Sequence, residues 1–259
     1  MKIFYSEYIT NYQTYTFGYA VYCILENIDE ISDAYKRGFL PYSGMTDLRE
    51  DVFYLSRGVR IKLNNFNLTK NDKYVVRKVE ENLSMEITIK KKEDALKIYP
   101  AIKKDFFNFA KSRFRMDVLD YKRVDYIFDK KFFKDIIIFT RDKKLIAYLL
   151  AVPVKNSVHI WYSIIGNQLD LNSIKNLGKY LLIKTLSYLK SSGLQYCYVG
   201  TCYGKNSRYK TDFLGAEFYN GNFWSDDLKL LSILKKDDEE VIRKKDIFKL
   251  GYLSINDIV

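Results

Sequence analysis

The sequence contains little histidine, cysteine or proline: one, three and three residues among 259. A Ser-His-Asp or Cys-His triad would have to use His159, which lies in an alternating apolar pattern typical of a strand. Cys23, Cys197 and Cys202 include no CxxC pair, and their odd number argues against a disulfide framework. A zinc or iron–sulfur site would therefore be short of ligands, so we expect no metal and no other cofactor.

Long apolar runs are also missing. The longest, at residues 145–154, is too short to span a bilayer. The segment after Lys2 is interrupted by polar residues, which argues against a signal peptide. We therefore expect a cytoplasmic protein with no membrane partner. The sequence indicates no oligomeric state.

Positive charge and tyrosine are abundant. The formal net charge is +11, from 43 Lys and Arg against 32 Asp and Glu. This excess favours a polyanionic partner, with a lysine-rich surface of no binding role as the alternative. The 23 tyrosines could stack on bases or line a pocket, although many are expected in the core.

The periodicity of apolar residues predicts an α+β protein. Before residue 93 it indicates a short helix at 29–37, a strand at 52–63, a helix after Thr69 and a strand at 83–89. After residue 93 it indicates helices at 93–112 and 117–128, strands at 136–139, 145–152 and 158–165, a long helix at 172–191, a strand at 196–199 and a strand or lid at 217–224.

The order of elements after residue 93 resembles the acyltransferase fold of the Gcn5-related N-acetyltransferase type, in which a mixed sheet surrounds a long central helix. In that fold the strands splay apart and leave a cleft for the acyl donor. We therefore expect three regions: a smaller basic N-terminal α/β region for tRNA or acceptor recognition (1–92), an acyltransferase-like catalytic domain (93–228) and a charged extension (229–259).

Phosphate-binding signals are weak in this sequence. Acetyl-CoA enzymes of that fold have a glycine-rich or basic turn at the head of the central helix. Here residues 175–180 occupy that place, and bulky Tyr180 replaces a small residue, so tight pyrophosphate binding is not expected. Residues 200–207 have some likeness to a P-loop, but the spacing is too short.

Several segments, taken in order, resemble the aminoacyl-tRNA–protein transferases, the arginyl- and leucyl-transferases of the N-degron pathway. They are residues 37–44, 59–63 with Phe66, 69–78, Leu177-Gly178-Lys179-Tyr180, Tyr198-Val199-Gly200 and Tyr209-Lys210-x-x-Phe213. The chain departs from the family in lacking the N-terminal cysteine cluster, in having residues 55–58 in place of a Cys-x-x-Cys, and in a shorter loop after Gly200.

The resemblance implies transfer of an amino acid from aminoacyl-tRNA to the amine of a protein or peptide, with an N-terminus as the expected acceptor. An activated ester needs positioning and an oxyanion donor, but no histidine. Backbone N–H groups near Tyr162 and Ser163 could hold the oxyanion, and Tyr198, Tyr209 and Lys210 could orient the ester or the acceptor. The alternatives are core packing for Tyr198 and a surface cation for Lys210.

Further residues are assigned to binding roles. Those expected to bind substrate are Arg60, Gly200, Ser163, Tyr180 and Phe213. Those expected to follow tRNA phosphates are Arg57, Lys70, Lys73, Arg77, Lys78, Arg113 and Arg115, with a solvated basic face as the alternative. Two other functions stay open: an acyl-CoA-dependent N-acyltransferase, and a non-enzymatic RNA- or peptide-binding module.

Overall fold

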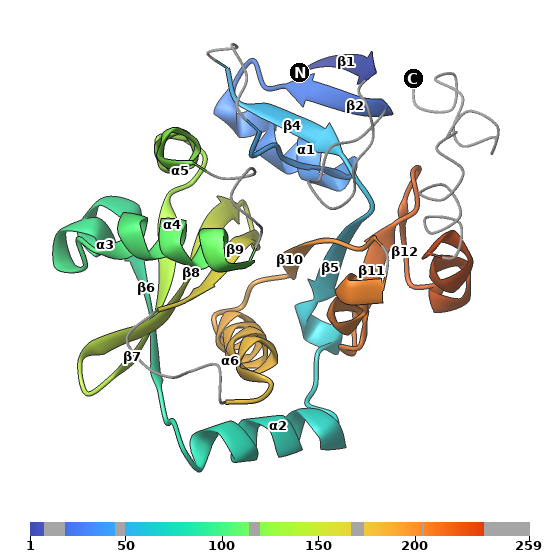
Figure 1. Ribbon diagram of the computed structural model, residues 1–259. Coiled ribbons are helices and arrows are strands. Elements are labelled where there is room, and N and C mark those ends of the chain that lie inside the picture. Colours follow the sequence, from blue (N-terminus) through green and yellow to red (C-terminus); the bar gives the residue numbers. More distant parts are fainter. Residues whose placement is uncertain (8–18, 45–49, 114–119, 167–173, 204, 236–259) are drawn as a thin grey trace. The chain divides into compact units, whose positions relative to one another are not determined.

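A computed structural model gives the structure of the protein (Figure 1). It describes residues 1–7, 19–44, 50–113, 120–166, 174–203 and 205–235. The chain divides into two compact units: unit 1 contains Met1–Tyr42, Thr46–Ile61 and Val199–Val259, and unit 2 contains Ser43–Met45 and Lys62–Tyr198. These are packing units, whereas the division expected at residues 92 and 228 is functional and stays a prediction.

Unit 2 is built on a mixed sheet, which confirms the α+β class. Its strand order is β10-β9-β8-β7-β6. The strands are β6 (Glu86–Lys91), β7 (Asp135–Arg141), β8 (Lys144–Val154), β9 (Ser157–Ile165) and β10 (Tyr196–Thr201). Strands β6 to β9 are antiparallel, and β10 pairs parallel with β9. The three strands predicted between residues 136 and 165 are thus confirmed.

Strands β7 and β8 form a hairpin, and the residues that join them are polar. Asp142 and Lys143 both have positive φ, 49° and 62°. Two successive residues in this conformation make the type of turn whose twist matches that of the flanking strands. The hairpin fixes the register of β8, in which residues 145–152 are all buried.

The described residues of unit 2 form five α-helices: α2 (Lys70–Glu80), α3 (Lys92–Ile98), α4 (Ile102–Arg113), α5 (Tyr121–Phe128) and α6 (Leu177–Ser191). Figure 1 shows α3, α4 and α5 on one side of the strands, with α6 and α2 on the other. Strand β8 is therefore covered on both faces, which explains its continuous burial.

Several predicted boundaries in unit 2 differ from those of the structure. The single helix predicted at 93–112 is wrong, because α3 ends before Pro100 and α4 begins after it; proline lacks an N–H and disfavours helix in the residue before it. The strand predicted at 83–89 lies instead at Glu86–Lys91. The long helix begins at Leu177, and residues 172 and 173 of its predicted start lie outside the described residues.

Unit 1 contains a four-stranded antiparallel sheet, with strand order β1-β2-β4-β3. Its strands are β1 (Lys2–Glu7), β2 (Tyr19–Ile24), β3 (Phe39–Pro41) and β4 (Val52–Leu55). Helix α1 (Ile31–Lys36) lies between β2 and β3 in the sequence. A second group pairs β5 (Gly58–Lys62), β11 (Ala216–Tyr219) and β12 (Trp224–Ser225). The strand predicted at 52–63 is therefore two strands, separated at Ser56 and Arg57.

Helix α1 stops before Gly38, as the sequence predicts. Gly38 has a φ of 80°, and a Cβ atom placed on it would lie 2.3 Å from the ring of Tyr219. Only glycine adopts this conformation at low cost and also leaves room for the ring. Gly38 thereby allows the chain to turn from α1 into β3 directly against β11.

Among the described residues, no helix combines the length and apolarity needed to cross a bilayer. Cys23, Cys197 and Cys202 are free and buried. Burial raises the pKa of the Cys23 thiol to about 12, so this thiol is protonated at neutral pH. The buried cysteines therefore act as small apolar side chains.

Candidate functional site

Strand β9 of unit 2 contains a β-bulge among the residues predicted to hold the oxyanion. Leu150 of β8 pairs with Tyr162, and Ala151 pairs with Ile160, so Trp161 is an extra residue on β9. Bulges of this kind bend a strand and redirect its side chains, and they are frequent beside active sites.

The bulge places the half-buried ring of Tyr162 against α4. The Tyr162 ring meets Phe106 at 5.0 Å between centroids, edge to face, and Trp161 at 5.4 Å. Such aromatic pairs stabilise a fixed ring orientation. Tyr162 therefore has a defined position on the α4 face of the sheet.

Beyond the bulge, one edge of β9 has no partner strand among the described residues. Strand β10 pairs with β9 only at Tyr196–Tyr198, opposite Ser157–His159. Within the described residues, no strand pairs with β9 on that side at Ser163.

The direction of the Ser163 N–H follows from the ladder with β8. The N–H of Gly166 donates to Ile146 at 2.8 Å, so this pair is hydrogen-bonded, and the hydrogen-bonded pairs alternate from there. Ser163, opposite Leu149, falls in a pair that is not hydrogen-bonded, so its N–H points away from β8. Ser163 is also an exposed residue.

Tyr198 lies on the same face of the sheet as Tyr162. It is opposite His159, which is opposite Val152, and residues two apart on a strand share a face. Tyr198 is 3% exposed and His159 is 2% exposed. Both side chains are therefore buried on the face of the sheet that α4 covers. This burial agrees with the alternative to a catalytic role for Tyr198, which is packing in the core.

The head of α6 is tied to α2 by two of its own side chains. The hydroxyl of buried Tyr180 donates to Glu80 Oε1 at 3.2 Å, and burial together with Glu80 raises the pKa of Tyr180. Lys179 pairs with buried Asp72 at 3.0 Å. Gly178 is exposed, with no heavy atom within 4 Å of a Cβ placed on it. The Tyr180 side chain therefore points into the α2–α6 contact, and Gly178 points away from it.

In unit 1 the structure brings together Gly200 and Lys210. The Lys210 ammonium donates to the Thr201 carbonyl at 2.9 Å. Gly200 has a φ of 87°, and a Cβ atom there would lie 3.2 Å from Lys210 Nζ. Burial of the ammonium lowers the pKa of Lys210 to about 8, while Cys202 opposes this shift. Lys210 is thus a half-buried amine that is partly neutral near physiological pH.

Arg57 belongs to the same group of unit 1 residues. Its carbonyl accepts from the Cys202 N–H at 2.9 Å, and its own N–H donates to the Tyr203 hydroxyl at 2.9 Å. The Arg57 guanidinium lies 5.1 Å from the centre of the Tyr203 ring. Ser207 Oγ donates to the Tyr203 carbonyl at 2.6 Å. Tyr203 is therefore bonded to the Arg57 backbone through its hydroxyl and to Ser207 through its carbonyl.

The other predicted residues of unit 1 have different surroundings. Arg60 donates from Nε to Glu217 Oε2 at 2.6 Å, and its guanidinium lies 4.5 Å from the centre of a Trp224 ring. Phe213 is buried, whereas Tyr209 is 41% exposed. Arg60 thus links β5 to β11 and packs on β12, while Tyr209 is accessible to a ligand.

Four of the cations expected to bind tRNA lie on one helix of unit 2. Lys70, Lys73, Arg77 and Lys78 are all exposed on α2. Arg57 lies in unit 1. The side chain of Arg113 and the whole of Arg115 lie outside the described residues.

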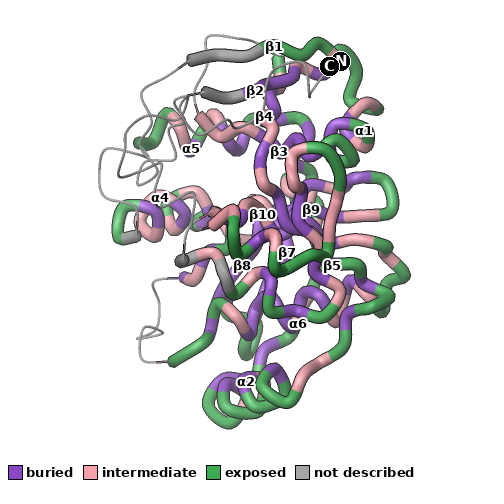
Figure 2. The backbone as a smooth tube through the Cα atoms, turned by 90° about the vertical axis from the view of Figure 1, so that its right-hand side faces the viewer, coloured by how far each residue is buried: buried purple, intermediate pink, exposed green. Residues whose placement is uncertain are grey.

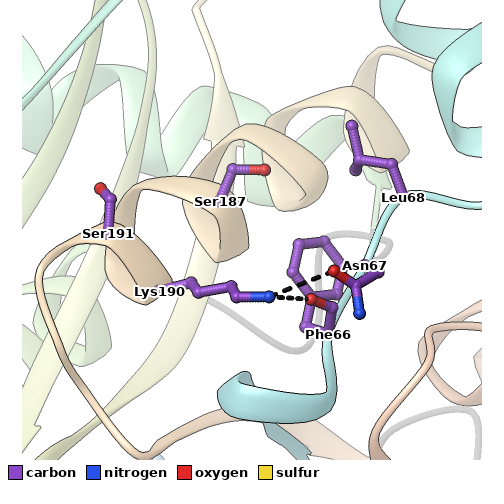
Figure 3. A pocket seen from close by; sticks show the side chains of 6 residues that line it. All are labelled: Phe66, Asn67, Leu68, Ser187, Lys190 and Ser191. Carbon is purple, nitrogen blue, oxygen red and sulfur yellow. Dashed lines mark hydrogen bonds between the residues drawn. The ribbon is translucent and has the colours of Figure 1, made fainter.

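A shallow pocket of unit 2 lies near the C-terminal end of α6 and contains none of the predicted site residues (Figure 3). It is lined by Phe66, Asn67, Leu68, Ser187, Lys190 and Ser191. Lys190 Nζ donates to the Phe66 carbonyl at 2.6 Å and to Asn67 Oδ1 at 3.3 Å. The cation in this pocket therefore already fastens α6 to the segment before α2. In the described part of the chain, no group of acidic, cysteine or histidine side chains is arranged to hold a metal ion.

Two features of these sites are absent from the sequence-based prediction. The bulge at Trp161 leaves no signal, because Ile160, Trp161 and Tyr162 form an unbroken apolar run. Tyr203 lies in the segment singled out after residue 200, but only the fold shows that its hydroxyl meets the Arg57 backbone.

No protein-family model and no curated protein sequence matches the chain. The chain is similar to the solved C-terminal domain (DUF2156) of a protein from Agrobacterium fabrum that is named as a lysylphosphatidylglycerol synthetase. The identity is 11%, the TM-score is 0.42, and the match covers 68% of this chain and 51% of that chain. It is also similar to the L-PGS of Bacillus licheniformis, with 12% identity, a TM-score of 0.44 and coverage of 71% of this chain and 55% of that chain.

A third similar structure contains a GCN5-related glucosamine N-acetyltransferase region of a fungal multi-domain β-N-acetylglucosaminidase, with 10% identity, a TM-score of 0.38 and coverage of 76% of this chain and 22% of that chain. The chain spans about half the length of the first two structures. At these TM-scores the likeness does not establish a shared fold, and no family is identified for this chain.

Proposed function

We propose that this protein is an aminoacyltransferase that moves an amino acid from aminoacyl-tRNA to the amine of a protein or peptide, on a Gcn5-related N-acetyltransferase-like scaffold. The arginyl- or leucyl-transferase type is the expected specificity, with an N-terminus as the acceptor. The observation that supports this most is the edge of β9 that no described strand pairs with, where the N–H of Ser163 points away from β8 beside the bulge at Trp161.

The proposed reaction needs few catalytic groups. The acceptor amine forms a C–N bond to the ester carbonyl, whose electrons move onto its oxygen. The Ser163 N–H is suited to hold this oxyanion, because a fixed backbone donor needs no reorganisation during the reaction. The intermediate then breaks the C–O bond to the ribose, and the ribose oxygen takes a proton as the tRNA leaves.

Loss of a proton from the attacking ammonium requires a base. Lys210 is the group we propose for this role, because its half-buried amine has a pKa of about 8 and is held by the Thr201 carbonyl. A base whose pKa lies close to the working pH combines a usable neutral fraction with sufficient basicity. Tyr209, which is exposed, is proposed to contact the ester or the acceptor.

The direct test is incubation with labelled aminoacyl-tRNAs and peptides that differ at their N-termini. Amine-dependent loss of the tRNA ester, with the label appearing on the peptide, is the expected result. If no charged tRNA transfers its amino acid to any amine, the proposed function is wrong.

Ser163 offers a sharper test of the mechanism. Ser163→Pro removes the backbone donor, and because this N–H does not serve the β8 ladder, the sheet is retained. We expect kcat to fall by about 100- to 1,000-fold. Ser163→Ala keeps the N–H and is the matched control, so its rate should stay near that of the unmodified protein. Equal rates for the two variants would exclude the Ser163 N–H as the oxyanion donor.

A second candidate, an acyl-CoA-dependent N-acyltransferase, is favoured by one observation. Gly178 in the first turn of α6 is exposed, with open space around its Cβ position, so this turn is accessible to a phosphate group. Acetyl-CoA that raises the melting temperature while tRNA has no effect would favour this candidate. Salt-sensitive RNA binding without transfer from any donor would instead favour the binding module.

A further inference from the structure

Helix α2 presents one continuous exposed face. The face consists of Lys70, Lys73, Tyr74, Arg77, Lys78 and Glu81, the last at the C-cap. These residues follow the three- and four-residue spacing that aligns side chains along a helix. The opposite side of the helix, with Val75 and Val79, is buried (Figure 2). The exposed face is therefore not needed for packing within unit 2.

Tyr74 is the unusual member of this face. It is 50% exposed, and the Arg77 guanidinium lies 5.8 Å from the centre of its ring. Among the described residues, the Tyr74 ring has no stacked or edge-to-face aromatic partner. An exposed tyrosine bordered by cations thus has a ring surface available to a ligand.

The charge of the face is strongly one-sided. Lys70 and Lys73 have no ion-pair partner in the described part of the chain. Glu81 is the one carboxylate of the face; it pairs with Lys78 at 2.9 Å and with Arg77 at 3.9 Å. Both pairs are exposed, and exposed pairs contribute little stability, so a phosphate can replace Glu81 at low cost.

From these observations we infer that α2 binds the unpaired bases and adjoining phosphates of an RNA strand, with Tyr74 stacking on a base and the lysines contacting phosphates. Aromatic rings among cations are the means by which proteins bind single strands. In duplex RNA the bases are stacked on one another and the major groove is too narrow for side chains. The inference rests on the proposed function and assigns α2 to a single-stranded part of the tRNA.

A membrane surface fits this face less well than RNA does. Helices that lie on membranes insert an exposed apolar face beside their basic one. In α2 the apolar residues Val75 and Val79 are buried in unit 2, Val76 is half-buried, and the basic face contains no aliphatic side chain. Anionic vesicles are therefore an outcome of the test rather than the proposed partner.

The test is fluorescence anisotropy with a short, unstructured, labelled RNA and with the same RNA in a duplex, over a range of salt. We expect Tyr74→Ala to weaken binding of the single strand by about 5- to 100-fold with little effect on the duplex. Tyr74→Phe keeps the ring and should bind nearly as the unmodified protein does. Lys73→Ala should lower the slope of log K against log salt by about 0.7.

Two exposed residues on other helices of unit 2 provide matched controls. Tyr121 of α5 is 52% exposed, but its ring stacks on Phe107 at 3.9 Å, and Lys97 of α3 is exposed. Tyr121→Ala and Lys97→Ala should leave RNA binding unchanged. The inference is overturned if the chain binds no RNA, if Tyr74→Ala and Tyr121→Ala weaken binding equally, or if phosphatidylglycerol vesicles bind while the single strand does not. Tyr74-dependent RNA binding without transfer would contradict only the proposed function.

Discussion

Replacement of Lys210 by methionine tests whether a partly neutral lysine acts in this protein. Methionine keeps much of the length and apolar volume but removes the amine. The pKa of Lys210 falls from 10.5 to about 8 because its ammonium is buried, with Thr201 as its hydrogen-bond acceptor. At pH 7 a pKa of about 8 gives a neutral fraction of roughly 10%, compared with about 0.03% for an ordinary lysine.

This difference sets the expected size of the effect. A 300-fold larger neutral fraction corresponds to about 3 kcal/mol, and partial exposure of the side chain makes this an upper limit. If Lys210 is the base, kcat rises with pH, is half-maximal near pH 8 and levels off above it. Lys210→Met should abolish this rise and lower kcat by about 100-fold or more, within the range for general base catalysis.

The same shift has a consequence for stability. The folded pKa lies below the unfolded one, so between about pH 8 and 10.5 the unfolded chain holds a proton that the folded chain has lost. The free energy of unfolding therefore gains a contribution from Lys210 as pH rises through this window. Urea unfolding at several pH values should show this gain in the unmodified protein and its absence in Lys210→Met.

Two measurements provide controls. Lys229 is an exposed lysine of unit 1, so Lys229→Met should change neither the pH–rate profile nor the pH dependence of unfolding. Titration of the labelled Lys210 amine by NMR should give a pKa near 8. A value near 10.5, or identical pH–rate profiles for Lys210→Met and the unmodified protein, would refute the reasoning.

Two further predictions concern stability and are measured by urea unfolding. Bonds from Thr69 and the Lys179 ammonium outweigh burial and lower the pKa of Asp72, so its contribution is present above pH 3.8 and is lost as the pH falls through its folded pKa. Asp72→Asn leaves Lys179 without its buried partner and should cost about 3 kcal/mol at neutral pH, with little difference from the unmodified protein in acid. Gly38→Ala combines a positive φ with a clash against the Tyr219 ring and should cost about 3 kcal/mol; an unchanged unfolding midpoint would contradict this account.

Local signals predict much of the fold. Thr69 caps α2, and its side-chain oxygen accepts a hydrogen bond from the N–H of Asp72. The carboxylate of Asp72 accepts a second hydrogen bond from the Thr69 N–H. This capping box is a pattern of residues three apart, so the sequence reveals it. The buried stripe of α6 and the turn at Asp142 and Lys143 are equally local. The break at Pro100 had a local signal too, but the apolar periodicity on both sides of it favoured one long helix.

Features that depend on distant residues are absent from the sequence-based prediction. The bulge at Trp161 appears only once the register of β8 against β9 is known. Lys179 and Tyr180 at the head of α6 have partners about 100 residues earlier, Asp72 and Glu80. The close approach of Lys210 to Gly200 depends on how the segment after β10 folds back. Such contacts leave no periodic pattern, because each joins single residues from separate elements.

The division into two units has a consequence for synthesis of the chain. Unit 2 is almost continuous, since apart from Ser43–Met45 it consists of Lys62–Tyr198. In unit 1, strand β5 pairs with β11, and Ile61 and Ala216 are partners in that pairing. As the chain leaves the ribosome, β11 therefore emerges more than 150 residues after β5. The residues of unit 2 emerge during this interval, so unit 2 can form before β11 covers its edge of β5. Contacts of such long sequence separation fold slowly, and the edge of β5 that β11 covers is open to wrong pairing during that interval.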